Sequence, residues 1–530
     1  MAILMHSKAL HSAYTNFPSI NFWWMNDRLN SSSPGTLRQS FTKEQLMLLL
    51  GEVIALALVV TLAARWFDFD GALQVVLGFT VAYLVPKFVY SNSKIACSWG
   101  KWLLLIFATL LAIYTIHTID LCTRASDFSF EEPDLHADDS RYYSWALSNY
   151  DGRCGEPKLP FKGLPWIMLW LWRFFGVSIV WPLAMNYMFT LLAIVTTGKI
   201  AHRMLSHRFD SCDPASIAAT AMLMTSLLCF LISQGVRIQK EAGCMLGIVM
   251  VGYSLAGLAQ TTQAGKREKM RDFAVFVLGT VLLAIIRTNF AYFAMIGAAM
   301  MAFANKGARW KRGTVMAVTA LAITLLFSIL FAYSFGQQFR TVDGGDAMAL
   351  AYKIKGLQTP YLSFIGDYYH YPKWERILLL PISGGVQYII PFPWLYEQDH
   401  LSITQVLPRI RLMWYFVGGV SIYYFLFICT VHYKRSNLGV WAWWPLAIFL
   451  IIAYITGGSV SRYAMPLQPL FVVIALFVLL HVKTGNYRRT FTIWMIVYSL
   501  VLVATLIFCY HTQTQYLNEL HEFQKMNSKH

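Results

Sequence analysis

Charged side chains are scarce in this sequence. They make up 13% of its 530 residues, whereas an ordinary soluble domain carries about 25%. Hydrophobic residues account for 57% of the chain, and the mean hydropathy is +0.49. This composition excludes a protein whose surface faces water throughout, and it indicates a chain embedded in a membrane.

Three features that define other classes of protein are also missing. The chain has eight cysteines, but no spacing of cysteine and histidine is typical of a zinc site. No internal repeat or low-complexity segment is visible, so we interpret the chain as one integrated membrane domain. Residues 1–43 lack the apolar core of a cleavable signal peptide, so we expect the first apolar segment to remain as a helix.

Long apolar segments, by contrast, recur along the whole chain. Each is close to the roughly 20 residues that cross a bilayer as a helix. We expect about thirteen such spans, of which the pair within 273–304 could instead form a helical hairpin that enters the membrane and returns. The spans are 45–64, 71–91, 102–120, 180–201, 214–232, 242–261, 273–287, 290–304, 313–335, 410–431, 440–456, 464–481 and 490–509.

The net charge of +16 lies in short basic clusters between these segments. Such placement argues against nucleic acid as a partner and is typical of cytoplasmic loops. The clusters fall in every second loop, on the side of the N-terminal segment 1–44, so the remaining loops and the tail 510–530 are expected in the periplasm. The clusters are Lys94/Lys101, Arg203/Arg208, Lys266/Arg267/Lys269/Arg271, Lys306/Arg309/Lys311/Arg312, Lys434/Arg435 and Lys483/Arg488/Arg489.

Two outward loops of the predicted transmembrane domain (45–509) are long, at 121–179 and 336–408. Loops of this length between closely spaced spans are usually functional. Each contains a short apolar stretch, 161–178 and 373–396. The first is rich in tryptophan, and we expect both to lie at the membrane interface rather than to cross the bilayer.

The first long loop carries two adjacent carboxylates, Asp138 and Asp139, followed by Tyr142 and Tyr143. One carboxylate could act as a general base that takes a proton from an attacking hydroxyl or amine. The acidic pair could also hold a divalent cation. The alternative is a solvated loop in which Asp139 caps a helix that begins near Ser140.

These residues, with three later motifs, resemble the pattern of GT-C-type membrane glycosyltransferases. The similarity is greatest to the bacterial enzymes related to protein mannosyltransferases and to the aminoarabinose transferase of lipid A. Counted from 102–120, the seventh helix precedes the second long loop, as in that family, so the resemblance covers about 102–480. The later motifs are Gln239-Lys240-Glu241, Arg287-Thr288-Asn289-Phe290 and Arg462-Tyr463 with Pro466.

The resemblance implies an all-α polytopic fold in the inner membrane of a bacterium. It implies transfer of a sugar from a polyprenyl-phosphate donor to a glycan, lipid or protein acceptor, with inversion or retention, and Asp138 or Asp139 as the base. No cofactor is implied, and the divalent cation that the acidic pair could hold stays an open alternative.

An anionic leaving phosphate needs cations in a partly dry site. The candidates for phosphate binding are Arg237, Lys240, Arg287 and Arg462. The candidates for sugar or acceptor binding are Tyr142, Tyr143, Glu241, Arg340, Asp367, Tyr368 and His370.

Two rival functions remain open. An O-antigen-type polymerase or ligase is suggested by Pro391-Phe392-Pro393-Trp394 in the second loop. A lipid or sugar transporter is less well supported, because two related halves are not visible.

Two further expectations concern single residues. Cys122 and Cys154 share the first outward loop, where an oxidising compartment would allow a disulfide. Glu52 lies inside the first span and is expected to face a neighbouring helix.

Overall fold

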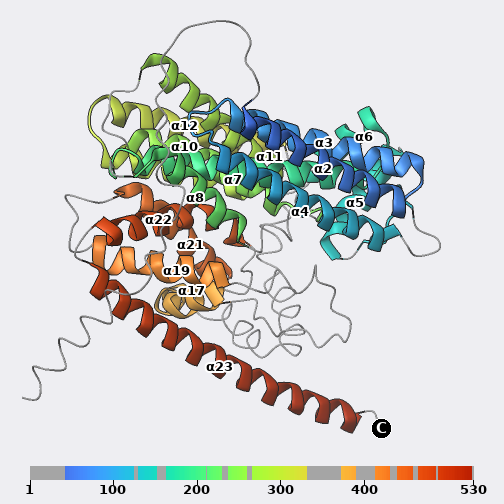
Figure 1. Ribbon diagram of the computed structural model, residues 1–530. Helices are drawn as coiled ribbons and strands as arrows, with labels where there is room; N and C mark the ends of the chain where they lie inside the picture. The colour runs from blue at the N-terminus through green and yellow to red at the C-terminus, as the bar shows by residue number, and fades with distance from the viewer. Residues whose placement is uncertain are drawn as a thin grey trace, which may run out of the picture. The chain divides into compact units, whose positions relative to one another are not determined.

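The computed structural model describes residues 42–123, 129–135, 137–151, 163–209, 212–228, 237–259, 265–330, 372–389, 412–429, 438–456, 463–484 and 487–527. The chain divides by compactness into residues 1–46 and 47–530. Only 42–46 of the first part are described, and Lys43 begins the first helix there. All regular secondary structure in these ranges is helical (Figure 1).

The first seven described helices include five that are long or deeply buried and two that are short and lie in the predicted first loop. The long or buried ones are α2 (Lys43–Trp66), α3 (Phe69–Ser91), α4 (Ser98–Thr123), α7 (Val180–Leu205) and α8 (Pro214–Ser226). The short ones are α5 (Ala137–Tyr150) and α6 (Gly163–Phe175). α6 has 13 residues, too few to cross a bilayer, which agrees with the interfacial position predicted for 161–178.

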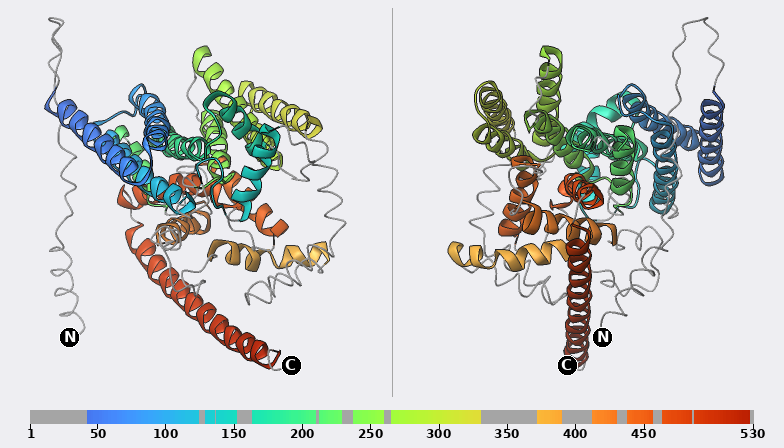
Figure 2. Two further views of the ribbon diagram at one scale, coloured as in Figure 1. Left: turned by 90° about the vertical axis from the view of Figure 1, so that its right-hand side faces the viewer. Right: turned by 60° about the vertical axis from the view of Figure 1, so that its left-hand side comes forward.

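The remaining helices follow in two groups. The first group is α10 (Glu241–Ala259), α11 (Lys266–Ala304) and α12 (Ala308–Leu330). The second is α16 (Lys373–Leu378), α17 (Leu380–Ile389), α19 (Leu412–Tyr423) with the π-helical turn η2 (Tyr424–Ile428), α21 (Val440–Thr456), the 3₁₀ turn η4 (Met465–Leu467), α22 (Gln468–Thr484) and α23 (Arg488–Asn527). Figure 2 shows α23 as one uninterrupted helix, so helical structure continues beyond the predicted end of its span at 509.

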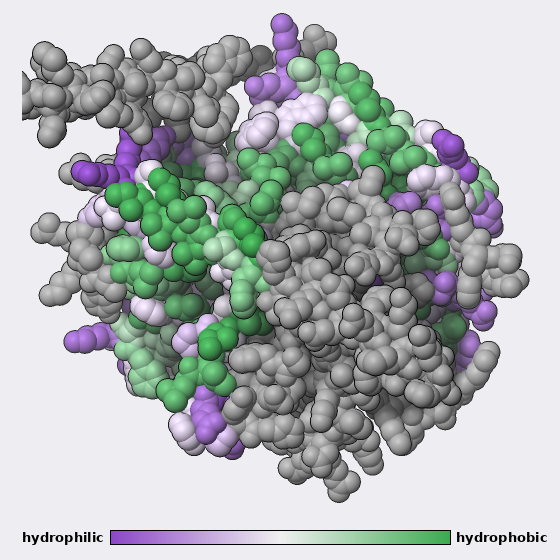
Figure 3. Space-filling view, turned by 90° about the horizontal axis from the view of Figure 1, so that it is seen from below, coloured by the Kyte–Doolittle hydropathy of each residue, from purple (hydrophilic) through white to green (hydrophobic). Residues whose placement is uncertain are grey.

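Nine described helices are long and apolar enough to cross a membrane, and two shorter apolar helices cover Leu412–Ile428 and Val440–Thr456. Seen from below, the described surface carries broad hydrophobic patches (Figure 3). The count differs from the thirteen predicted spans for identifiable reasons. The two helices just named are short, the described part of 214–232 is the 13-residue α8, and α11 holds two predicted spans. The chain is thus an all-helical polytopic membrane protein.

α11 reverses direction at Arg287, whose backbone is not helical (φ −155°, ψ 89°). Asp272, near its start, pairs with Arg312 at 2.8 Å. Ala302, near its end, packs so closely on Gly313 that an added Cβ there would lie 2.8 Å from the Ala302 Cα atom. Residues 272 and 302 would be about 45 Å apart along a straight helix. Both can touch consecutive residues of α12 only if the chain turns back, so the segments 273–287 and 290–304 run in opposite directions, as two short spans and a re-entrant hairpin both require.

The centre of the bundle is formed by α7, α10 and α22. Their apolar windows are 72%, 83% and 83% buried, whereas those of α2 and α23 are 11% and 0% buried. α7 and α10 run parallel, since Asn186 contacts residues 237 and 239 at one end and Arg203 contacts Tyr253 near the other. Lipid therefore faces the outer helices, and charged groups on the inner ones need partners within the protein.

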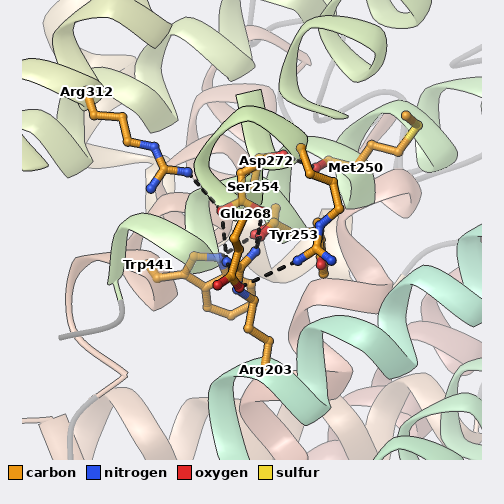
Figure 4. Close-up of polar contacts among 10 residues, drawn as sticks. Arg203, Met250, Tyr253, Ser254, Glu268, Asp272, Arg312 and Trp441 are labelled. Carbon is orange, nitrogen blue, oxygen red and sulfur yellow. Dashed lines mark hydrogen bonds and ion pairs between the residues drawn. The ribbon is translucent and has the colours of Figure 1, made fainter. Parts of the chain in front are cut away.

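One such set of charged groups, the Asp272 cluster, consists of Arg203, Tyr253, Glu268, Asp272 and Arg312 (Figure 4). The Asp272 side chain is fully buried. Arg203 donates to both its oxygens at 2.8 Å, and Arg312 donates to one of them at 2.8 Å. Glu268 accepts from Arg203 at 3.1 Å, and the Arg203 guanidinium lies over the Tyr253 ring. The cluster joins α7, α10, the start of α11 and α12.

The reversal at Arg287 predicts where cysteines can be labelled in a background without native cysteine. Gly265→Cys and Lys306→Cys, at the two ends of α11, should react with a membrane-impermeant maleimide from the same side of the membrane. Asn289→Cys, an exposed position beside the reversal, should react from the opposite side. Labelling of residues 265 and 306 from opposite sides would show that α11 crosses once.

The Asp272 cluster predicts a large asymmetry between two acidic residues. Asp272→Asn removes the buried charge that Arg203 and Arg312 share and should cost about 3 kcal/mol of unfolding free energy. Glu268→Gln, at a side chain that is 42% exposed, should cost less than about 1 kcal/mol. Thermal unfolding of both purified variants measures the difference. Equal melting temperatures would contradict this account of the cluster.

Candidate functional site

Seven described residues meet at the end of the bundle opposite the Asp272 cluster, and we call them the Arg287 site. They come from α5, from the segment 237–241, from the α11 reversal and from the position two residues before η4. They are Asp139, Tyr142, Arg237, Lys240, Glu241, Arg287 and Tyr463. Arg287 is 15 residues from Asp272, or about 22 Å along the helix.

The position of α5 is set by Tyr143. Its hydroxyl donates to the carbonyl oxygens of Phe130 (3.0 Å) and Glu131 (2.9 Å), and its ring packs edge-on against Trp172 of α6. Burial raises the pKa of Tyr143 well above its ordinary value, and the nearby carboxylates of Glu131 and Glu132 add to the shift. The hydroxyl therefore stays protonated and donates to the backbone. This role is structural, whereas Tyr143 was predicted as a candidate for sugar or acceptor binding.

Asp139 is the third residue of α5 and is 7% exposed. The helix begins at Ala137, so the prediction of a solvated Asp139 that caps a helix near Ser140 is wrong. One carboxylate oxygen lies 3.8 Å from Nε of Arg237. Arg237 leaves half of its side chain exposed, so this cation faces both the buried carboxylate and the surroundings.

Lys240 is almost completely buried, at 3% exposure, directly before α10. Its ammonium lies 4.6 Å from the centre of the Tyr142 ring, a geometry in which the ring face stabilises the cation. Tyr142 and Asp139 belong to the same turn of α5. The segment 237–241 is therefore attached to α5 through both of its outward cations.

Glu241 and Arg287 form the other half of the site. Their closest charged atoms are 3.8 Å apart, and both side chains are 8% exposed. The Arg287 guanidinium stacks 3.7 Å from the centre of the Tyr463 ring and 4.9 Å from that of Phe290. A planar cation between two rings keeps its charge where little water reaches it.

Two close approaches place the backbone of the site. The amide of Asn186, on α7, donates to the carbonyl oxygens of Arg237 (2.5 Å) and Gln239 (3.0 Å). Gly163 lets the start of α6 reach the reversal, because an added Cβ would lie 1.5 Å from the Ile285 oxygen. α6, α7, α10 and α11 thus converge beside the charged residues.

The site holds more positive than negative charge. Three cations, Arg237, Lys240 and Arg287, face two carboxylates, Asp139 and Glu241. Each ion pair is longer than a hydrogen bond, so it depends on charge rather than on a fixed contact. Such an arrangement can accept an additional anion beside a buried carboxylate.

Several predicted residues lie outside the residues that the structure describes. They are Arg340, Asp367, Tyr368, His370, Arg462 and Cys154, together with the Asp138 side chain. The disulfide between Cys122 and Cys154 therefore stays a prediction, as does the contribution of the second loop. Within the described residues, no group of three or more His, Cys, Asp or Glu side chains is placed to hold a metal ion.

Sequence reasoning missed two residues of this region. Asn186 was treated as part of an apolar span, although a buried amide in such a span is itself a signal of a required hydrogen bond. Tyr463 was noted only as part of a motif, and its stacking on Arg287 depends on segments 176 residues apart.

No family model and no curated protein matches this chain. Two solved structures of an oligosaccharyltransferase from Archaeoglobus fulgidus are similar, each at 13% identity. The complex with Zn and sulfate gives a TM-score of 0.39 over 77% of this chain and 53% of its own. AglB with an inhibitory peptide and a dolichol-phosphate gives 0.40 over 80% and 56%. The chain spans about half the length of these structures. Similarity at this level carries no argument, so the function rests on the site.

The Asn186 contacts predict a structural effect without any substrate. Asn186→Leu leaves one buried and one partly buried carbonyl oxygen without their donor and should cost about 2 kcal/mol of unfolding free energy. Thr190→Val is the matched control, because its buried hydroxyl bonds only to the preceding turn of α7. Melting temperatures of the two purified variants give the comparison. A larger loss for Thr190→Val would refute this role for Asn186.

Proposed function

We propose that this chain is a membrane glycosyltransferase that takes a sugar from a polyprenyl-phosphate donor at the Arg287 site. The single observation that carries the proposal is the convergence of a buried carboxylate with three cations at one end of the bundle. Sugar transfer from a phosphate needs both kinds of group, a base for the acceptor and positive charge for the leaving group.

The proposed reaction assigns a part to each group. Asp139 accepts the proton of the acceptor hydroxyl or amine, whose oxygen or nitrogen forms a bond to the anomeric carbon. The bond from that carbon to the phosphate oxygen breaks, and its electron pair leaves on the polyprenyl phosphate. Arg237, Lys240 and Arg287 stabilise the negative charge that develops there.

Asp139 is favoured over Asp138 as the base because of its surroundings. Its carboxylate is buried beside Arg237, the most exposed cation of the site. A donor phosphate that binds Arg237 would weaken the ion pair between Arg237 and Asp139. The Asp139 carboxylate would then accept a proton more readily. Binding of the donor would then prepare the base for the acceptor, an order that follows from the shared arginine.

The side of the membrane follows from the basic residues. Lys266, Arg267, Lys306 and Arg309 lie at the ends of the α11 hairpin opposite the reversal. Basic residues concentrate on the cytoplasmic side of membrane proteins. We therefore propose that the Arg287 site faces the periplasm of a bacterial inner membrane, where the acceptor is a glycan, lipid or protein.

The proposal predicts the rates of three variants in proteoliposomes. A panel of undecaprenyl-phosphate sugars serves as donor, and release of undecaprenyl phosphate is measured with the wild-type protein first. Asp139→Asn should lower the rate about 10²- to 10⁴-fold, and Arg287→Gln at least about 10²-fold. Glu131→Gln, an exposed carboxylate in the same loop, should leave the rate within about twofold.

Asp138→Asn is included because its side chain is not described. Full activity in both the Asp138 and the Asp139 variants would refute the assignment of the base. A wild-type protein that consumes no donor of the panel would count against sugar transfer itself. A ladder of many repeat units instead of one added sugar would favour the polymerase reading.

A further inference from the structure

A cavity of about 260 Å³ lies between α2, α3 and α4, and none of the residues of the Arg287 site lines it. Its walls are mainly apolar, with Leu56 on α2, Phe79 on α3 and Ala112 on α4 as examples. Leu49, Val53 and Leu56 line the cavity and are also 49%, 56% and 44% exposed. The wall formed by α2 thus belongs to the surface that faces membrane lipid.

The packing of α2 explains why there is space behind it. Only 11% of its apolar window is buried, the smallest share among the spanning helices that precede α23. Among its contacts with the rest of the bundle, Glu52 bonds to α3, and Gly51 faces the Trp102 ring of α4. Atoms that line an empty gap lose the dispersion contacts that a filled gap would give them, which is unfavourable. Water does not fill a gap that is lined by apolar groups. Within a bilayer, the material that can fill it is hydrocarbon.

One part of the cavity wall is polar. Glu52 and Tyr83 both line it, and the Tyr83 hydroxyl donates to one oxygen of Glu52 at 2.9 Å. Lys87, one turn further along α3, donates to the other oxygen at 2.5 Å. This confirms that Glu52 faces a neighbouring helix. The Lys87 side chain is 33% exposed, and an ammonium has three donor hydrogens, so it can also bind a phosphate oxygen.

The basic residues around this end indicate which lipid fits. Lys94 follows the end of α3 and Lys101 lies in the first turn of α4, and Lys199 donates to the carbonyl oxygen of Val89 near the end of α3. Such a basic region is typical of the cytoplasmic side, where anionic phospholipid headgroups attract juxtamembrane lysines. A phosphate headgroup at Lys87 would place its hydrocarbon chain beside the apolar opening.

We propose that this cavity binds one acyl chain of an anionic glycerophospholipid, whose phosphate pairs with Lys87. The lipid fills the space between α2 and the pair α3–α4 and attaches α2 to the bundle. This site is separate from the Arg287 site, so the proposal stands or fails independently of sugar transfer.

The test uses the full-length protein, purified in detergent, with added dioleoyl-phosphatidylglycerol or dioleoyl-phosphatidylcholine. Phosphatidylglycerol at saturation should raise the melting temperature of the wild type by about 3 °C or more, and phosphatidylcholine should raise it less. Lys87→Gln should remove this difference between the two lipids. Lys311→Gln, at an exposed lysine of α12 outside this basic region, should keep it.

Ala112→Phe fills the cavity and should abolish the response to both lipids, whereas Leu77→Phe, on the lipid-exposed side of α3, should retain it. Native mass spectra of the wild type should show one retained phosphatidylglycerol per chain. If Ala112→Phe fails to fold, this measurement on the wild type tests the proposal without that variant. An unchanged lipid response in Ala112→Phe, or a wild type that retains no glycerophospholipid, would overturn the proposal. Displacement of the bound lipid by undecaprenyl phosphate at equal concentration would show that the occupant is the wrong one.

Discussion

A buried arginine at a chain reversal is the constraint on which the rest of this structure depends. A guanidinium near hydrocarbon is costly unless carboxylates or aromatic rings compensate for the lost water. Arg287 obtains both, from Glu241 at the start of α10 and from Tyr463 before η4. Three segments that are distant in the sequence must therefore meet at this point, and the spacing of α10, α11 and α22 follows from their meeting.

The two polar regions lie 15 residues apart on α11, or about 22 Å along the helix. At one end, the Asp272 cluster is saturated with short hydrogen bonds between two arginines and one carboxylate. At the other end, the ion pairs of the Arg287 site are 3.8 Å long, and Arg237 is half exposed. The first arrangement is suited to holding helices together, whereas the second leaves room for an incoming anion. The same types of residue thus suit two different roles because the distances between them and their exposure to solvent differ.

Much of the fold was predictable from periodic composition. The long apolar segments predicted the nine described helices that can cross a bilayer, and 161–178 was predicted not to cross, which agrees with the 13 residues of α6. The candidate site was predictable in part. Ionisable residues at the ends of spans singled out Arg237, Lys240 and Arg287, and Asp139, Tyr142 and Glu241 were also candidates, but the pairing among them was not predicted. Asn186 and Tyr463 act through contacts across 51 and 176 residues of sequence, and no local pattern encodes such distances.

The sequence by itself determined that this is a helical membrane protein, and it showed which charged residues lie at the ends of apolar segments, where burial of a charge is costly. These properties depend on residue composition within windows of about 20 residues. Only the tertiary structure decided that α11 folds back on itself, that Asp139 is buried beside Arg237, and that a cavity remains behind α2. Each of these depends on which helix faces which, and that is settled by packing and charge pairing among segments far apart in the chain.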